Sequence, residues 1–152
     1  MPELEHFRGH WGLSRVIEDA RTGGTARLEG RAVFAPEGEG LRYTEEGVLR
    51  IEGHAPLTAT RAYLWRPATG GIELFFEDGR FFHAIGPGVH PQALHDCPPD
   101  RYEVAYDFAA WPRWSSRWRV TGPRKDYVMT SRYAPGGTCE DPGSGAQDGA
   151  MD

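Results

Sequence analysis

The sequence predicts an all-β protein, a closed antiparallel up-and-down barrel of about ten strands that follows a short N-terminal helical turn. Twenty glycines and twelve prolines lie between short runs of aromatic and β-branched residues, a pattern typical of many strands joined by turns. Little helix is available to cover a sheet, so closure on itself is the simplest way for the sheet to protect its edges. Side chains alone can fill the interior of a barrel of up to ~8 strands, so we expect an internal cavity in a barrel of about ten strands.

The expected elements follow from the alternation of apolar and polar residues between turn signals. Asp78-Gly79 is the strongest hairpin signal, because both residues tolerate positive φ and they separate two aromatic runs. Residues 41–44 and 48–52 are predicted to form a short hairpin around Glu45-Glu46-Gly47, and the proline-rich residues 86–100 are predicted to form a loop. The helical turn is expected at residues 4–7, and the other strands at 10–17, 26–34, 57–66, 72–77, 81–83, 102–108, 115–121 and 126–133.

Composition indicates one domain, residues 1–133, and a tail, residues 134–152, that is rich in glycine, proline and acid and is expected to be disordered. The net charge is −5, of which −4 lies in the tail, so the nearly neutral domain argues against a nucleic-acid partner. The start of the chain has no signal-peptide pattern, and no apolar run approaches the ~18 residues of a spanning helix. Cys97 and Cys139 do not indicate a disulfide framework. We therefore expect a cytoplasmic protein with no membrane span.

Several short motifs are distributed over the domain. The tripeptide Gly9-His10-Trp11 resembles the Gly-x-Trp signature of the calycin group, which includes lipocalins, fatty-acid-binding proteins and nitrobindin-like haem barrels. The whole set resembles DUF6314, a bacterial calycin-like family whose activity is unassigned. The motifs are Gly9-His10-Trp11 with Arg15, Tyr43-x-Glu45 with Gly47, Arg61-x-Tyr63-x-Trp65, Asp78-Gly79-Arg80 with Phe82-His83, His95-x-Cys97-x-x-Asp100-x-Tyr102, and Trp118-x-Val120-x-Gly122-Pro123-x-Lys125-Asp126-Tyr127.

The calycin resemblance implies a role in ligand binding and a closed barrel end. It gives Gly9 and Trp11 a structural role, with a basic residue from a late strand stacking on Trp11. The candidates for that residue are Arg117, Arg119 and Arg132. Haem is a variant that the resemblance also implies, through a late histidine, but this sequence has no histidine after His95.

The motif Arg61-x-Tyr63-x-Trp65 is the first candidate ligand site. A spacing of two places all three side chains on one face of a strand, where a guanidinium between aromatic rings suits an anionic or planar ligand. The alternative is that this face points outward and that Ala62 and Leu64 point inward. If Arg61 faces the cavity, Glu45, Asp78 and Asp100 are its candidate ion-pair partners.

The second candidate combines Arg80 with His83. These two residues cannot both point inward without a β-bulge, because alternate residues of a strand face opposite sides. His83 is a candidate ligand-binding or proton-transfer imidazole, or else an ordinary core or surface histidine. Tyr106 and Trp118 supply aromatic lining for a pocket, or else part of the core.

The segment around His95 and Cys97 carries potential metal ligands and a potential nucleophile. No second pair stands at ligand spacing, so no metal site is predicted. A cysteine nucleophile would need a base that the sequence does not place. The alternative is a loop packed over the mouth of the barrel.

Three classes of function are compatible with these features. The leading hypothesis is a barrel that binds a small anionic or amphipathic organic molecule in its interior. The rival is an enzyme in the same pocket, with His83 or His95 as acid or base and Tyr63 or Tyr106 as a donor. The sequence contains no phosphate-binding loop, Gly-x-Ser-x-Gly elbow, His-Glu-x-x-His motif or dinucleotide fingerprint, so catalysis is the weaker hypothesis. The third is an interaction module that uses its loops or tail. The residues expected to bind the ligand are Arg61, Tyr63, Trp65, Arg80, His83, Tyr106 and Trp118.

Overall fold

The computed structural model describes residues 2–136 and contains one 3-10 helix and ten strands in that range. The all-β prediction is confirmed, and the predicted helical turn is the 3-10 helix η1. Among these residues, no helix has the length and apolar character that a membrane-spanning segment needs. The elements are η1 (Leu4–Phe7), β1 (Gly9–Asp19), β2 (Thr25–Glu37), β3 (Gly40–Ile51), β4 (Leu57–Ala68), β5 (Gly71–Phe76), β6 (Phe81–Ile85), β7 (Gln92–Cys97), β8 (Asp100–Asp107), β9 (Trp114–Gly122) and β10 (Lys125–Pro135).

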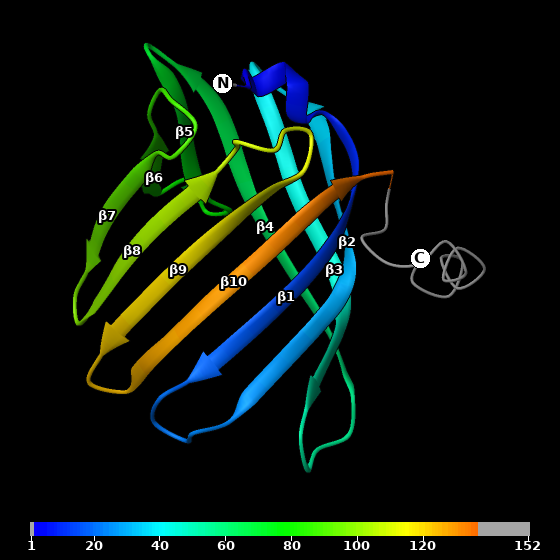
Figure 1. Cartoon of the computed structure of the whole chain (residues 1–152). Coiled ribbons are helices and arrows are strands. Elements are labelled where there is room, and N and C mark those ends of the chain that lie inside the picture. Colours follow the sequence, from blue (N-terminus) through cyan, green and yellow to red (C-terminus); the bar gives the residue numbers. More distant parts are fainter. Residues whose placement is uncertain (1, 137–152) are drawn as a thin grey trace.

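The strands form one antiparallel meander that curls into a nearly closed barrel (Figure 1). The strand order in the sheet is β6-β5-β4-β3-β2-β1-β10-β9-β8-β7, so the pairing of β10 with β1 joins the two halves of the chain. The edge strands β6 and β7 lie beside each other across a seam that no hydrogen-bonded ladder bridges within the described range. The predicted barrel is therefore confirmed, with one interruption in the ring of strands.

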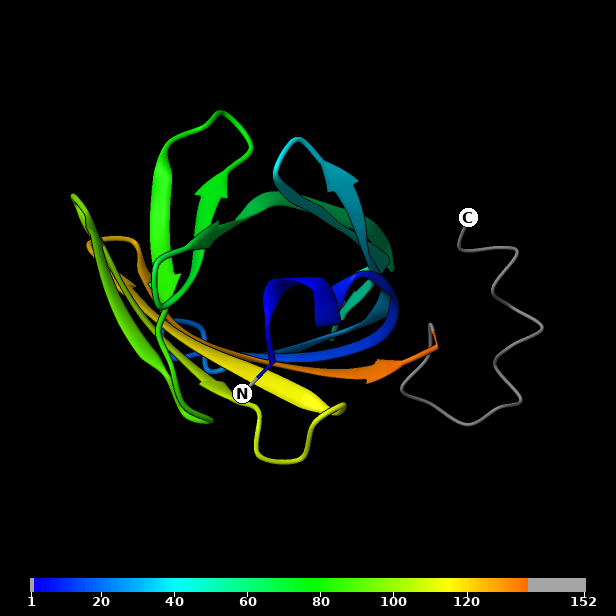
Figure 2. The same cartoon turned by 90° about the horizontal axis from the view of Figure 1, so that it is seen from above.

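The two ends of the barrel differ. Helix η1 lies over one end, which we call the η1 end; Figure 2 looks down on it. The turns that join β1 to β2, β3 to β4, β7 to β8 and β9 to β10 lie at the opposite end, the lower end in Figure 1, which we call the far end.

The Asp78-Gly79 hairpin is confirmed as the connection between β5 and β6. Gly79 has φ of 95°, a value that glycine adopts without a steric penalty. A carboxylate oxygen of Asp78 accepts the backbone N–H of Arg80 at 3.0 Å and so supports the turn.

The predicted hairpin around Glu45-Glu46-Gly47 is wrong, because these residues continue a single strand, β3, from Gly40 to Ile51. Both neighbouring strands pair with this segment, as in Gly30 with Gly47 and Arg61 with Glu45. Pairing on both sides thus overrides the local turn preference.

The loop predicted at residues 86–100 is only partly correct. Residues 92–97 form strand β7, which pairs with β8 from Gln92 opposite Ala105 to Cys97 opposite Asp100. The side chains in β7 alternate between exposed and half-buried, as in a strand that has one face toward solvent. The prolines that flank this segment had indicated a loop instead. The tail expected from residue 134 begins inside β10, which continues to Pro135, and its residues from 137 onward, Cys139 included, lie outside the described residues.

The η1 end is sealed by an aromatic cluster around Phe7, which is fully buried. The Trp11 indole Nε1 donates a hydrogen bond to the Phe7 carbonyl oxygen at 2.7 Å and so holds η1 against β1. Five rings have centroids between 5.0 and 5.8 Å from the Phe7 ring, namely Phe34, Trp65, Phe108, Trp111 and Trp114.

The arginine expected to stack on Trp11 is not the residue that covers this ring. The rings of Trp111 and Trp114 lie 5.6 and 6.0 Å from it instead. Arg119 points away from the interior and pairs with Asp126 at 3.4 Å, while the other two candidates, Arg117 and Arg132, are exposed. Trp11 therefore packs in the aromatic cluster of the η1 end, with tryptophan rings beside it where the resemblance implied a guanidinium.

Two glycines allow β2 and β3 to approach closely near the middle of the barrel wall. A Cβ atom on Gly30 would lie 2.1 Å from the Glu46 carbonyl oxygen and 2.5 Å from the Gly47 Cα. Both of those atoms belong to the backbone, so neither can move aside without distortion of β3.

We expect Gly30→Ala to lower the free energy of unfolding by about 1–3 kcal/mol, because the added methyl overpacks the contact between β2 and β3. Denaturation in urea measures the change. The matched control is Gly86→Ala, since a Cβ at Gly86 meets nothing within 4 Å. Equal stability of the two variants would contradict the close-approach explanation.

Candidate functional site

The interior of the barrel is buried at the η1 end and half-exposed at the far end. Along β4, the inward residue Trp65 is 3% exposed, Tyr63 and Arg61 are half-buried, and Leu57 is 55% exposed. On β10, Tyr133 is buried while Tyr127, nearer the far end, is half-buried. A ligand from solvent therefore meets the interior at the far end.

A buried ion pair crosses the middle of the barrel between Arg15 on β1 and Glu45 on β3. The two guanidinium nitrogens Nη1 and Nη2 donate to the two Glu45 carboxylate oxygens at 2.5 and 2.9 Å. Arg15 Nε also donates to the Ser131 hydroxyl on β10 at 2.7 Å, and the Tyr43 hydroxyl donates to Glu45. The Tyr43 and Tyr133 hydroxyls are 2.8 Å apart and complete the network.

The network keeps both members of the pair ionised. Burial disfavours the charge of Arg15, but the hydrogen bonds and negative charge of Glu45 raise the pKa of the guanidinium above its ordinary value. Burial likewise opposes the charge of Glu45, and the hydrogen bonds and charge of Arg15 hold its pKa below the usual range. Burial, together with the charge of Glu45, raises the pKa of Tyr43, so its hydroxyl stays a donor.

Arg61 lies on the inward face of β4, toward the far end, which is one of the two orientations that the sequence left open. Its Nη1 lies 3.4 Å from the Tyr63 hydroxyl, to which it donates, and its guanidinium carbon lies 5.7 Å from the centre of the Trp118 ring. Glu45 is its neighbour across the β3–β4 ladder, but both carboxylate oxygens of Glu45 are bound to Arg15. The other predicted partners are engaged elsewhere, Asp78 with Arg80 and Asp100 with Lys125.

The interior therefore carries one more positive than negative charge. Arg15 and Glu45 neutralise each other, and the Lys125–Asp100 pair at the rim of the far end has an N–O distance of 2.9 Å. Among residues 2–136, no carboxylate lies within ion-pair distance of Arg61.

A cavity in the middle of the barrel brings together five of the seven predicted ligand-binding residues, namely Arg61, Tyr63, Trp65, Tyr106 and Trp118. Its volume is about 20 Å³, room for a single water molecule and far below the ~300 Å³ of the smallest usual ligand pockets. The interior large enough for an organic molecule, expected from the strand number, is instead filled by aromatic side chains. A haem ring does not fit this space.

His83 points into the core, and Arg80 does not. The His83 Nε2 atom lies 2.7 Å from the Tyr106 hydroxyl, and the histidine is 1% exposed. Burial, with a smaller effect from the charge of His95, lowers the pKa of His83 to about 3, so the imidazole is neutral. The register in which β5 pairs with β6 shifts between Leu74 and Phe75, an irregularity of the ladder next to the strand that carries His83.

The sequence left open which of Arg80 and His83 faces the interior, and Arg80, although named among the candidate ligand-binding residues, faces solvent. Its side chain is 67% exposed and pairs with Asp78 at 2.8 Å, and its guanidinium carbon lies 5.2 Å from the centre of the Phe76 ring. Arg80 belongs to the turn before β6, where solvent accommodates its charge without burial.

His95 and Cys97 share the half-buried face of β7. The His95 ring lies 5.4 Å from Phe82 and 6.0 Å from Tyr102, measured between ring centres, so it packs among aromatic rings. In the described part of the chain, no group of three potential metal ligands is close enough to bind an ion.

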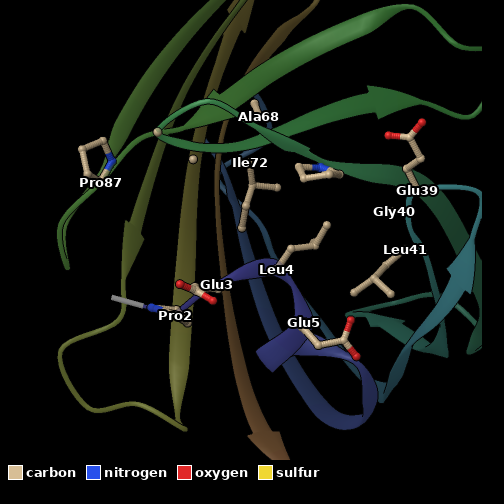
Figure 3. Close-up of a pocket in the computed structure, with 13 residues that line it drawn as sticks. Pro2, Glu3, Leu4, Glu5, Glu39, Gly40, Leu41, Ala68, Ile72 and Pro87 are labelled. Atoms are coloured by element: carbon tan, nitrogen blue, oxygen red, sulfur yellow. The ribbon is translucent and has the colours of Figure 1, made fainter.

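A larger pocket, of about 630 Å³, lies at the η1 end (Figure 3). Leu4, Leu41 and Ile72 form apolar walls, and the carboxylates of Glu3, Glu5 and Glu39 stand around them. The sequence motifs did not indicate this pocket, because its walls come from η1 and from the ends of strands β3, β4 and β5.

Comparison with known proteins agrees with the barrel architecture. The family described as "Family of unknown function (DUF6314)" matches residues 7–135. The chain belongs to this family. The DUF6314 barrel is similar to the structure of the S-type phycobiliprotein lyase CPES from Guillardia theta, with a TM-score of 0.60 and 6% sequence identity over 91% of this chain and 90% of that chain. At this identity the similarity shows a shared fold alone. No curated protein matches the chain in sequence.

Glu45→Gln should lower the free energy of unfolding by about 3–5 kcal/mol, because it leaves the buried Arg15 charge uncompensated. Urea denaturation at neutral pH measures the loss. The matched control is Asp126→Asn, which breaks the half-exposed pair with Arg119 and should change stability little. A loss no greater for Glu45→Gln than for the control would show that the pair does not support the barrel.

His83 should make the protein less stable as the pH falls below 6.5. The unfolded chain binds a proton at the ordinary histidine pKa of 6.5, whereas the folded protein does so only at about 3. Stability is therefore greatest above pH 6.5 and falls by up to about 1.4 kcal/mol per pH unit toward pH 3. Between pH 6.5 and 5, His83→Gln should flatten this dependence, and His10→Gln, at an exposed histidine, should not. If the stability of the two variants depended on pH in the same way, the loss of stability below pH 6.5 could not be assigned to His83.

Proposed function

We propose that this barrel binds a small organic molecule through an anionic group at the far end, with Arg61 as the anchor. The observation that supports the proposal is the excess positive charge at Arg61, which is half-buried and inward-facing and makes no ion pair with another described residue, because both carboxylate oxygens of Glu45 are bound to Arg15. A guanidinium partly removed from water is stabilised by an anionic acceptor, and its planar fork suits a carboxylate, sulfonate or phosphate.

The surroundings of Arg61 supply the rest of a binding surface. Tyr63 and Tyr127 are half-buried, and the charge of Arg61 partly offsets the increase in their pKa values that burial causes, so both lie within its electrostatic influence. Tyr102 and Phe76 are also half-buried and pack against the core. Aromatic rings with polar tips favour a ligand that has a flat or apolar body.

The small central cavity sets the depth at which the ligand binds. Beyond Arg61 there is room for one water molecule, so the body of the ligand stays at the far end and only its anionic group reaches inward. His83 and Tyr106 are within hydrogen-bonding distance of each other, as the enzyme alternative requires, but both are almost fully buried. Binding is therefore the function that the geometry favours over catalysis.

Titration with the anionic fluorophore anilinonaphthalene sulfonate tests the anchor. Arg61→Met keeps most of the side-chain length and removes the charge, so we expect the dissociation constant to rise about tenfold or more, equivalent to about 1.4 kcal/mol. Trp118, whose ring lies next to Arg61, is one of five tryptophans, so the loss of energy transfer in Trp118→Phe relative to the wild type tests whether the fluorophore binds at the far end.

The matched control is Arg66→Met, which removes an exposed arginine from the outer face of the same strand. This variant should bind the fluorophore as the wild type does. Equal affinity of wild type and Arg61→Met, with both folded by circular dichroism, would overturn Arg61 as the anchor.

A further inference from the structure

The pocket at the η1 end is separate from the far-end site and has the dimensions of a ligand site. Its volume of about 630 Å³ lies within the usual range of 300–1,000 Å³ for small-molecule pockets. Leu4 and Ile72 project toward one another across it, and Leu41 lines the side near the β2–β3 turn (Figure 3). Leu41 and Ile72 are 4% and 3% exposed, so the floor of the pocket belongs to the hydrophobic core.

The walls of this pocket are held in place before any ligand arrives. Phe7, the last residue of η1, is fully buried among five aromatic rings, and its carbonyl oxygen accepts the Trp11 indole N–H. The opposite wall is formed by the ends of β3, β4 and β5, which belong to the continuous sheet. A preformed pocket needs little ordering of side chains on binding, which favours affinity.

The charge of the pocket is negative. Among the described residues, its lining includes the carboxylates of Glu3, Glu5 and Glu39 and no lysine, arginine or histidine. Glu5 pairs with Arg8 at 3.1 Å, but both side chains are more than half exposed, so solvent weakens that pair. Glu3 and Glu39 make no ion pair in the described part of the chain.

We propose that the η1-end pocket binds a small amphipathic cation, an organic ammonium ion with an apolar chain. The chain would lie against Leu4, Leu41 and Ile72, and the ammonium group would lie among the three carboxylates. This ligand is opposite in charge to the one proposed for Arg61, and the two sites occupy opposite ends of the barrel. A ligand with an anionic head is disfavoured here by the same carboxylates.

Isothermal titration calorimetry with octyltrimethylammonium measures this site directly, with octyl sulfate and octyl glucoside as the anionic and neutral compounds of equal chain length. We expect the cation to bind more tightly than either. The double variant Glu3→Gln/Glu39→Gln should weaken cation binding about four- to tenfold, since each exposed carboxylate contributes roughly two- to threefold, and should leave the neutral compound unaffected. Ala68→Phe, which places a ring in the pocket from the end of β4, should weaken all pocket binding at least tenfold.

The matched control for charge is Glu18→Gln/Glu52→Gln, which removes two exposed carboxylates near the far end and should leave cation affinity unchanged. Amide chemical shifts at Leu4, Leu41 and Ile72 should move on addition of the cation, in the wild type and in Arg61→Met alike. Equal affinity for the cation and octyl sulfate, or full retention of cation binding by Ala68→Phe, would overturn the proposal. Both comparisons are made in Arg61→Met, which lacks the proposed far-end anchor, so neither result depends on whether Arg61 anchors an anion.

Discussion

The ion pair between Arg15 and Glu45 is the interaction on which the middle of the barrel depends. It connects β1, β3 and, through Ser131, β10, so three strands far apart in the sequence are joined by side chains across the interior. Both groups are almost fully buried, and either charge alone would be costly in that environment. The pair also determines the state of Arg61, because it occupies the carboxylate that lies opposite Arg61 on β3.

The aromatic side chains that fill the barrel give its two ends different roles. Phe7 and the tryptophans around it exclude water from the η1 end, and the central cavity has room for about one water molecule. Arg61 brings positive charge to the half-exposed far end, and the acidic pocket of about 630 Å³ lies beside η1. The two ends therefore carry opposite charges, which is why the two binding proposals call for ligands of opposite charge.

Much of the site was predictable from the alternation of residues along single strands. That Arg61, Tyr63 and Trp65 share one face follows from a spacing of two, and so does the conflict between Arg80 and His83, but the sequence did not decide which face of β4 points inward. The Arg15–Glu45 pair was missed, although Arg15 continues the inward alternation of Trp11 and Leu13 and Tyr43-x-Glu45 stands among the motifs. The reason is that residues 45–47 have the composition of a turn, and only pairing with β2 and β4 extends the strand through them.

The sequence alone determined the all-β class, the approximate number of strands, the antiparallel meander and the Asp78-Gly79 turn, because these features depend on local alternation and on residues that tolerate positive φ. Tertiary structure decided which charges neutralise each other, how much space the interior retains, and where the acidic pocket lies. Each of these depends on side chains from strands that are distant in the sequence: Glu45 is bound by Arg15 and not by Arg61, and the pocket is formed where η1 meets the ends of β3, β4 and β5. Volume and charge balance are properties of the packed interior, and no single segment contains them.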